Sequence, residues 1–230
     1  NGAGKTTIFN LLTKVYQPTR GTIMVDGIDT HSMNTAQVNK LGVARTFQNI
    51  RLFDNLSVED NVKLGMHNQI NYGMFSGIMR LPSYWKQERI AHERAMELLS
   101  IFDMEDLADA KAGSLPYGAQ RRLEIVRALG TNPSLLLLDE HTAALDPATA
   151  AKVLEISDKI VEENQLTTMM ITHNMKDAIK YGNRLIMMYE GHIIYDVRGE
   201  EKANLQVGDL LQRFEQVSDG EFANDRMLLS

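Results

Sequence analysis

Four consecutive leucines, Leu135 to Leu138, run directly into two acidic residues, Asp139 and Glu140. An uninterrupted aliphatic run is typical of a strand buried on both faces, as in a parallel sheet covered by helices. Ligands of such sheets bind at the carboxyl ends of the strands. The run therefore predicts a wound α/β sheet with two carboxylates at its ligand-binding edge, although a core strand can also end in two solvated acids.

Strands and helices alternate through much of the chain, which favours a parallel sheet. We expect strands at Val43–Phe47 and Thr168–Thr172 and a helix that begins at Pro147. Two hairpins are predicted from the turn dipeptides Asp26-Gly27 and Glu190-Gly191. Further helices are expected where apolar residues recur at helical spacing: Ile8, Leu11, Leu12 and Val15; Ala91, Ala95, Leu98, Leu99 and Phe102; Leu123 to Leu129; and Val207, Leu210, Leu211 and Phe214.

The interval between Gln48 and Leu115 reads as helical, with a helix start at Ser57 and a Gly- and Met-rich loop from Asn71 to Pro82. We expect residues 49–119 to form an inserted helical subdomain. Residues 1–48 and 120–198 are expected to form the core, and residues 199–230 a tail on the same single domain.

Composition narrows the function classes. The formal net charge of −6 argues against broad nucleic-acid binding, which depends on basic surface. The absence of cysteine excludes disulfides and thiol chemistry. No apolar run approaches the ~20 residues that cross a bilayer, so we expect any membrane association to go through a partner.

The first residues match the second half of the phosphate-binding loop G-x-x-x-x-G-K-[ST]. Backbone N–H groups and the amino end of the following helix bind phosphate in such loops. Lys5 is expected to reach the β- and γ-phosphates and Thr6 to bind Mg²⁺, which makes ATP and Mg²⁺ the predicted cofactors. A glycine-rich turn that only begins a helix is the alternative. The predicted nucleotide-binding residues here are Asn1, Gly2, Ala3, Gly4, Lys5, Thr6 and Thr7.

Polar residues at three strand ends supply the predicted catalytic groups. Asp139 is expected to hold Mg²⁺ through a water, and Glu140 to act as general base toward the attacking water. Gln48 can contact both metal and water, and His173 can hydrogen-bond the γ-phosphate. Each residue alone could be an ordinary loop residue; their combination and order in the chain favour function.

These motifs together resemble the ATP-binding-cassette (ABC) transporter family along almost the whole chain. The run Leu115 to Gln120 resembles its signature motif, and Leu138 to Asp146 resembles its Walker B strand and D-loop. Phe47-Gln48 is similar to its Q-loop and Thr172-His173 to its switch histidine. The resemblance implies a P-loop NTPase (RecA-like) fold, here expected to be truncated at its amino end.

The resemblance also implies partners. In that family two ATPase subunits enclose two ATP molecules, so Leu115, Gly118 and Gln120 are expected at the partner's nucleotide and Asp146 at the dimer interface. Asp146 can equally cap the helix at Pro147. Transmembrane permease subunits, and indirectly a solute-binding protein, follow from the same resemblance. So does a peripheral location on the cytoplasmic face of the cell membrane.

Four departures from the family pattern stand out. Pro116 replaces the usual serine of the signature, Ala119 its glutamine, and His141 the proline after the general base. The first strand, with the aromatic that stacks on adenine, is expected to be missing.

The subclass is read from two parts of the chain. Residues 23–127 resemble ATPases of branched-chain amino-acid importers, whereas the chain from Asp139 resembles a related importer group. An intermediate family member or a mosaic joined between Arg127 and Asp139 accounts for both. Two alternatives to transport remain: a non-transport ABC ATPase of DNA repair or the ribosome, and an inactive fragment.

Overall fold

The computed structural model describes residues 3–68 and 82–217, which divide into two compact units. The large unit comprises the described residues between Phe9 and Met170, and the small unit comprises residues 3–8 together with 171–217. The division follows contacts rather than the boundaries predicted above, which stay a prediction. Residues 1, 2 and 69–81, which include Asn1, Gly2 and most of the predicted loop, lie outside the described residues.

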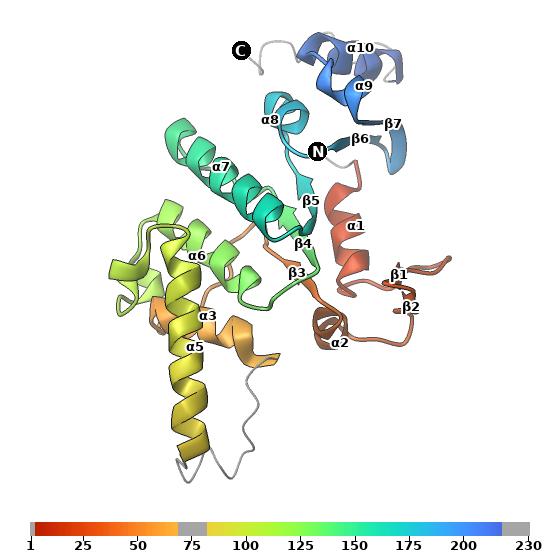
Figure 1. The fold of residues 1–230 in the computed structure, drawn as a ribbon. Coiled ribbons are helices and arrows are strands. Elements are labelled where there is room, and N and C mark those ends of the chain that lie inside the picture. Colours follow the sequence, from red (N-terminus) through yellow and green to blue (C-terminus); the bar gives the residue numbers. More distant parts are fainter. Residues whose placement is uncertain (1–2, 69–81, 218–230) are drawn as a thin grey trace. The chain divides into compact units, whose positions relative to one another are not determined.

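The sheet of the large unit has the strand order β3-β4-β5 (Figure 1). Strand β3 (Val43–Arg45) pairs in parallel with β4 (Leu135–Asp139), so that Val43 lies opposite Leu135. The leucines at 136, 137 and 138 are almost fully buried, as expected for a central strand. Strand β5 (Thr167–Ile171) is the other neighbour of β4; its last residue belongs to the small unit. This arrangement confirms the predicted parallel α/β sheet.

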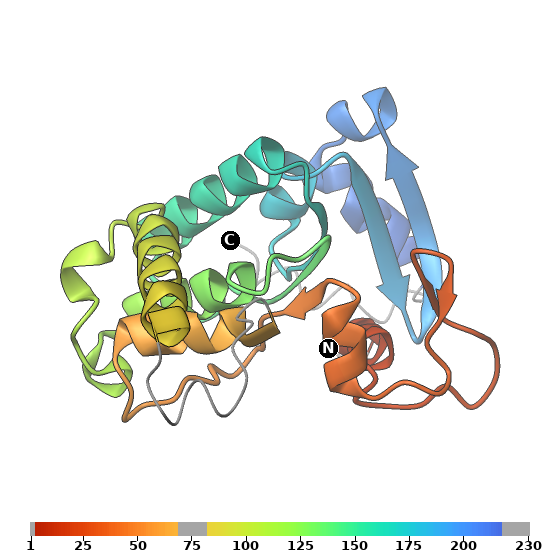
Figure 2. The ribbon, with the colours of Figure 1, turned by 60° about the horizontal axis from the view of Figure 1, so that its bottom comes forward.

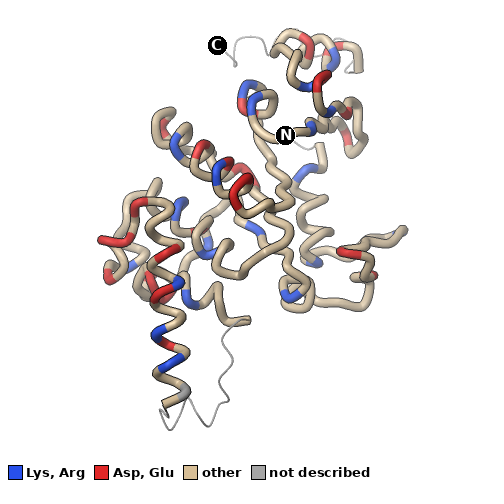
Figure 3. The backbone as a smooth tube through the Cα atoms, viewed as in Figure 1, with Lys and Arg blue, Asp and Glu red and all other residues tan. Residues whose placement is uncertain are grey.

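Three helices beside this sheet form a shared core: α3 (Val58–Gly65), α5 (Pro82–Ser100) and α6 (Tyr117–Leu129). Figure 2 shows them together in yellow, orange and green. Their apolar faces meet in one cluster. This confirms the helix that was predicted from the spacing of Ala91, Ala95, Leu98 and Leu99, which is α5. The cluster includes Val58, Val62, Ala95, Leu99, Phe102, Leu123 and Val126. Basic and acidic residues alternate along α5 (Figure 3), and the exposed Arg94 and Glu97 form an ion pair at 2.9 Å.

The remaining helical segments of the large unit are shorter than α3, except for α7. They are α2 (Thr35–Lys40), η1 (Met66–Asn68), η2 (Glu105–Leu107), η3 (Ala112–Ser114) and α7 (Pro147–Glu163), while α1 (Lys5–Leu12) begins in the small unit. Two predicted starts are confirmed by side-chain caps. Ser57 Oγ accepts the Asp60 N–H at 3.0 Å, and Asp146 Oδ1 accepts the Thr149 N–H at 3.0 Å.

Both predicted hairpins form. Strands β1 (Met24–Val25) and β2 (Ile28–Asp29) flank Asp26 and Gly27, which have φ of 48° and 77°. Strands β6 (Arg184–Tyr189) and β7 (His192–Arg198) flank Glu190 and Gly191 at 45° and 80°. Two successive positive φ angles match the backbone twist of a two-residue hairpin, and glycine adopts them without steric cost.

In the small unit, β6 and β7 pack with α8 (Met175–Lys180), α9 (Glu200–Ala203) and α10 (Val207–Val217). Leu185, Val197 and Leu210 form its core, which confirms the amphipathic helix predicted in the tail. The buried Lys202 ammonium donates to the carbonyls of Ile179 and Tyr181 at the end of α8. Cationic side chains stabilise helix carboxyl ends in this way.

Two elements are shorter than predicted. Helix α1 ends at Leu12 because Lys14 adopts a φ of 57°, and Val15 is left half exposed. Strand β3 ends at Arg45 rather than at Phe47, since side chains of α6 bind the backbone of Phe47 and Gln48. None of the helices in residues 3–68 and 82–217 is both long and apolar enough to cross a membrane.

Candidate functional site

Gln48 and Glu140 meet beyond the ends of β3 and β4. The Gln48 Nε2 amide donates to Glu140 Oε2 at 3.1 Å, although the two residues are 92 positions apart. Glu140 has a φ of 46°, a conformation that costs free energy for a residue with a side chain. Residues in this conformation occur in turns, as at Asp26 and Glu190, and also at active sites. The structure therefore brings together two of the predicted catalytic residues.

Asp139 is buried at the last position of β4, with 1% of its surface exposed. Its Oδ2 forms an ion pair with Arg45 Nη2 at 2.6 Å, and its N–H donates to Thr46 Oγ1. Its Oδ1 is buried and has no hydrogen-bond partner among the described residues. An orphaned carboxylate oxygen at a strand end fits the predicted role of holding a metal-bound water.

Arg45 keeps the Asp139 carboxylate in place from the neighbouring strand. Its guanidinium also donates to Asn10 Oδ1 at 2.7 Å and lies over the Phe9 and Phe47 rings. Arg45 was not among the residues predicted from the sequence. A charged residue inside an apolar strand was the available signal, because a buried charge requires a partner.

His141 follows these acids and is one of the residues that depart from the family pattern. It is 1% exposed, and neither ring nitrogen has a hydrogen-bond partner among the described residues. Burial lowers the pKa of His141 to about 4, and the nearby Arg121 charge acts in the same direction. The imidazole is therefore neutral at physiological pH.

The predicted partner-facing residues lie on and beside two helices: Gly118 and Gln120 are on α6, Leu115 precedes α6, and Asp146 caps α7. Gly118 packs against Thr149 and Leu145, where an added Cβ would lie 3.1 Å from Thr149 Cγ2. The Gln120 amide donates to the carbonyl of Leu115, whose side chain is buried. Hydrogen bonds to Thr149 lower the pKa of Asp146, as expected for a carboxylate that caps a helix.

Two buried residues of α6 that sequence reasoning missed contact the segment around Gln48. Arg121 and Glu124 form an ion pair at 2.8 Å, with side chains 0% and 1% exposed. Burial raises the pKa of the Glu124 carboxyl, although Arg121 acts in the opposite direction. Opposite charges three residues apart on one helix were the signal in the sequence.

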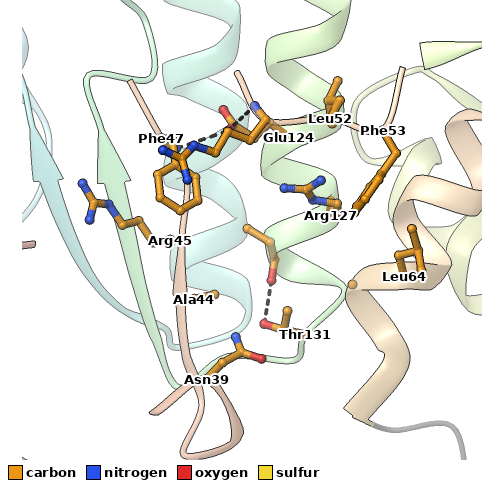
Figure 4. A pocket seen from close by; sticks show the side chains of 13 residues that line it. Asn39, Ala44, Arg45, Phe47, Leu52, Phe53, Leu64, Glu124, Arg127 and Thr131 are labelled. Atoms are coloured by element: carbon orange, nitrogen blue, oxygen red, sulfur yellow. Dashed lines mark hydrogen bonds between the residues drawn. The ribbon is translucent and has the colours of Figure 1, made fainter. Parts of the chain in front are cut away.

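A pocket of about 450 Å³ lies between α6 and the segment that follows Gln48 (Figure 4). Arg127 and Glu124 project into it from α6, Leu52 and Phe53 come from that segment, and Phe47 lies just before Gln48. Arg127 lies over the Phe53 ring with its guanidinium carbon 5.8 Å from the ring centroid. The pocket therefore combines cationic and aromatic groups.

The small unit brings together other predicted residues. Lys5, at the start of α1, and His173, after β5, line one pocket of about 510 Å³ with Ala3. Gly4 has a φ of 88°, which lets the chain enter the helix. Thr6 is half-buried and Thr7 exposed. A lysine at a helix amino end is suited to binding an anion such as phosphate.

Comparisons with known proteins agree with these observations. The family described as ABC transporter matches residues 1–143. The branched-chain amino-acid transport ATP-binding protein BraF of Pseudomonas aeruginosa is 36% identical over 201 residues, which are 87% of this chain and 79% of that protein. The tyrosine transport ATP-binding protein of Clostridioides difficile is 35% identical over 218 residues, 94% and 83% of the two chains.

Solved structures show the same likeness. The ADP conformation of MJ1267, an ATP-binding cassette of an ABC transporter, matches with a TM-score of 0.74 and 27% identity. It covers 93% of this chain and 84% of that one. A dimeric post-hydrolysis state of the cassette MJ0796, bound to ADP and Pi, matches with a TM-score of 0.71, 28% identity and coverage of 85% and 81%. The chain belongs to the ABC transporter family, as an ATPase domain similar to the ATP-binding subunits of amino-acid importers.

Proposed function

We propose that this ATPase domain drives the import of branched-chain or related amino acids, as a peripheral subunit on the cytoplasmic face of the cell membrane. The relatives named for branched-chain amino-acid and tyrosine transport support this substrate class. The observation that carries ATP hydrolysis is the contact of Gln48 with Glu140 at the end of β4. The likeness to the tyrosine transport protein spans 94% of the chain, which supports one intermediate family member over a mosaic.

The residues present fit a nucleotide with its magnesium. Lys5 and the N–H groups at the start of α1 bind the phosphates, together with Gly4 and Thr7. The Thr6 hydroxyl, Gln48 and the orphaned oxygen of Asp139 are the groups that would hold Mg²⁺, directly or through water. Bound Mg²⁺ neutralises charge that develops on the phosphate oxygens.

Glu140 accepts a proton from the attacking water, and the Gln48 amide holds the Glu140 carboxylate toward that water. His173 donates a hydrogen bond to the γ-phosphate from the small unit. Because ADP lacks the γ-phosphate, hydrolysis removes the contacts that favour two ATPase subunits closed around the nucleotides.

The second ATPase subunit completes each site in this proposal. Gly118 directs backbone N–H groups to the partner's nucleotide, with Leu115 and Gln120 beside it and Asp146 at the interface. Residues 49–61 contact the permease subunits, which a solute-binding protein supplies with cargo. The pocket lined by Phe53 and Arg127 has cationic and aromatic groups, which supports this segment as the docking surface.

Reconstitution with the cognate permease in proteoliposomes tests the proposal. We expect ATP-dependent uptake of labelled leucine, isoleucine, valine or tyrosine. Glycine betaine serves as the comparison cargo, since a relative named for its transport is 30% identical over 217 residues. ATP hydrolysis without uptake of any of the four amino acids would contradict the proposed substrate class.

A further inference from the structure

The segment from Phe47 to Arg51 is held by side chains of α6 rather than by a strand. Arg121 Nη1 donates to the Phe47 carbonyl at 2.5 Å, and Arg121 Nη2 donates to the Gln48 carbonyl at 2.6 Å. Glu124 Oε1 accepts the N–H groups of Phe47 at 3.2 Å and of Arg51 at 3.4 Å. One ion pair therefore satisfies four backbone groups of this segment.

The chemistry of the pair suits this task. A guanidinium presents several donors in a fixed planar fork, so one Arg121 can bind two successive carbonyls and Glu124 Oε2 together. The second carboxylate oxygen remains available for the N–H groups. Both side chains are fully buried, which keeps water from competing for these bonds.

The bound segment carries Gln48. Its carbonyl accepts from Arg121, and its side-chain amide donates to Glu140 Oε2. A shift of this backbone unit would move the amide away from the carboxylate. The contact between Gln48 and Glu140 thus depends on α6, the helix that also carries Gly118.

We propose that Arg121 and Glu124 are positioning residues for hydrolysis: they fix the Phe47–Arg51 backbone so that Gln48 holds Glu140 in its working orientation. This inference rests on the proposed roles of Gln48 and Glu140. It goes beyond them by making the signature helix a determinant of the geometry of the general base in the same subunit.

The test uses the full-length ATPase assembled with its permease. The double variant Arg121→Met/Glu124→Leu removes both buried charges at once, so that neither is left unpaired in the core. The matched control is Arg94→Met/Glu97→Leu, which removes an Arg–Glu pair of the same spacing from the exposed face of α5. Thermal melts establish that each variant is folded.

We expect the Arg121→Met/Glu124→Leu enzyme to lose up to about 100-fold in kcat, the scale of a misplaced catalytic group, with little change in the KM for ATP. The control should retain the wild-type kcat. The single variant Arg121→Lys should also have a low kcat, because an ammonium lacks the planar fork of the guanidinium. A kcat unchanged in the folded double variant overturns the proposal.

A double-mutant cycle with Gln48→Ala separates positioning from a general loss of structure. If Arg121 and Glu124 act through Gln48, Gln48→Ala lowers kcat in the wild type but has little further effect in the Arg121→Met/Glu124→Leu background. Fully additive losses overturn the positioning role. A different result would show that the proposed roles of Gln48 and Glu140 are themselves wrong: Gln48→Ala and Glu140→Gln would then leave hydrolysis unchanged in the wild-type background.

Discussion

At the scale of single residues, the site depends on side chains that come from distant parts of the sequence. Glu140 lies in a left-handed conformation and receives the Gln48 amide, while Asp139 beside it is paired with Arg45. Adjacent carboxylates thus have different environments: one is buried and paired with an arginine, and the other is partly exposed. This difference supports the proposed roles of Asp139 in metal binding and of Glu140 in proton transfer.

Replacing Glu140 by glutamine tests the general base. Glutamine keeps the size of the side chain and can still accept from Gln48, but it cannot take a proton from water. We expect phosphate release to fall by about 100-fold or more, the usual contribution of a general base, while ATP binding persists and traps a dimer. Phosphate release and size-exclusion chromatography with ATP measure both effects.

Glu155→Gln is the matched control, because Glu155 is an exposed glutamate on α7. It should hydrolyse ATP at the wild-type rate. Normal turnover by the Glu140→Gln enzyme would remove Glu140 from the base role.

At the scale of elements, side-chain caps fix where helices begin. Asp146 precedes Pro147 at the start of α7, and its carboxylate accepts the Thr149 N–H. Because the charged form makes this bond, the folded pKa lies below its unfolded value. The cap contribution is therefore present above the unfolded pKa and is lost as the pH falls through the folded pKa.

The variant Asp146→Asn tests this pH dependence of stability, since asparagine caps helices without titrating. We expect the wild type to lose more stability than Asp146→Asn when the pH is lowered from 6 to 3. Urea midpoints of the two proteins at each pH measure the difference. Parallel pH dependence of the two midpoints would show that the Asp146 charge does not support the cap.

At the scale of the whole molecule, the proposed transport requires a surface through which ATP-driven closure reaches the permease. Phe53 is half exposed at the mouth of the pocket beside Arg127, within the segment proposed to contact the permease. An exposed aromatic residue at the centre of an interface is a frequent determinant of binding.

Phe53→Ala should therefore weaken permease binding by about tenfold or more, corresponding to loss of a buried aromatic anchor. Basal ATPase activity should remain, because Phe53 contacts none of the proposed catalytic groups. Copurification with the permease and transport in proteoliposomes measure the effect. Met24→Ala, a change at a similarly exposed residue of β1, serves as the control, and equal transport by the two variants would exclude this docking surface.

Features that depend on neighbouring residues could be predicted from the amino-acid sequence. Ser57 and Asp146 cap helices through residues three positions away, and the Asp26-Gly27 and Glu190-Gly191 dipeptides turn the hairpins. The buried strand was readable because four leucines leave no polar face. The order of the motifs then indicated the family. This chain has, in the order typical of that family, the phosphate loop, Gln48, the signature, Asp139-Glu140 and His173.

Which charged residues support the site could be seen only in the folded chain. Arg45 reaches Asp139 across 94 positions, and Arg121 reaches Phe47 across 74. No local spacing encodes such pairs, because they depend on how β3, β4 and α6 pack. The early end of β3 has the same cause: side chains of α6 supply the hydrogen bonds that a longer strand would have made, since buried backbone groups require partners.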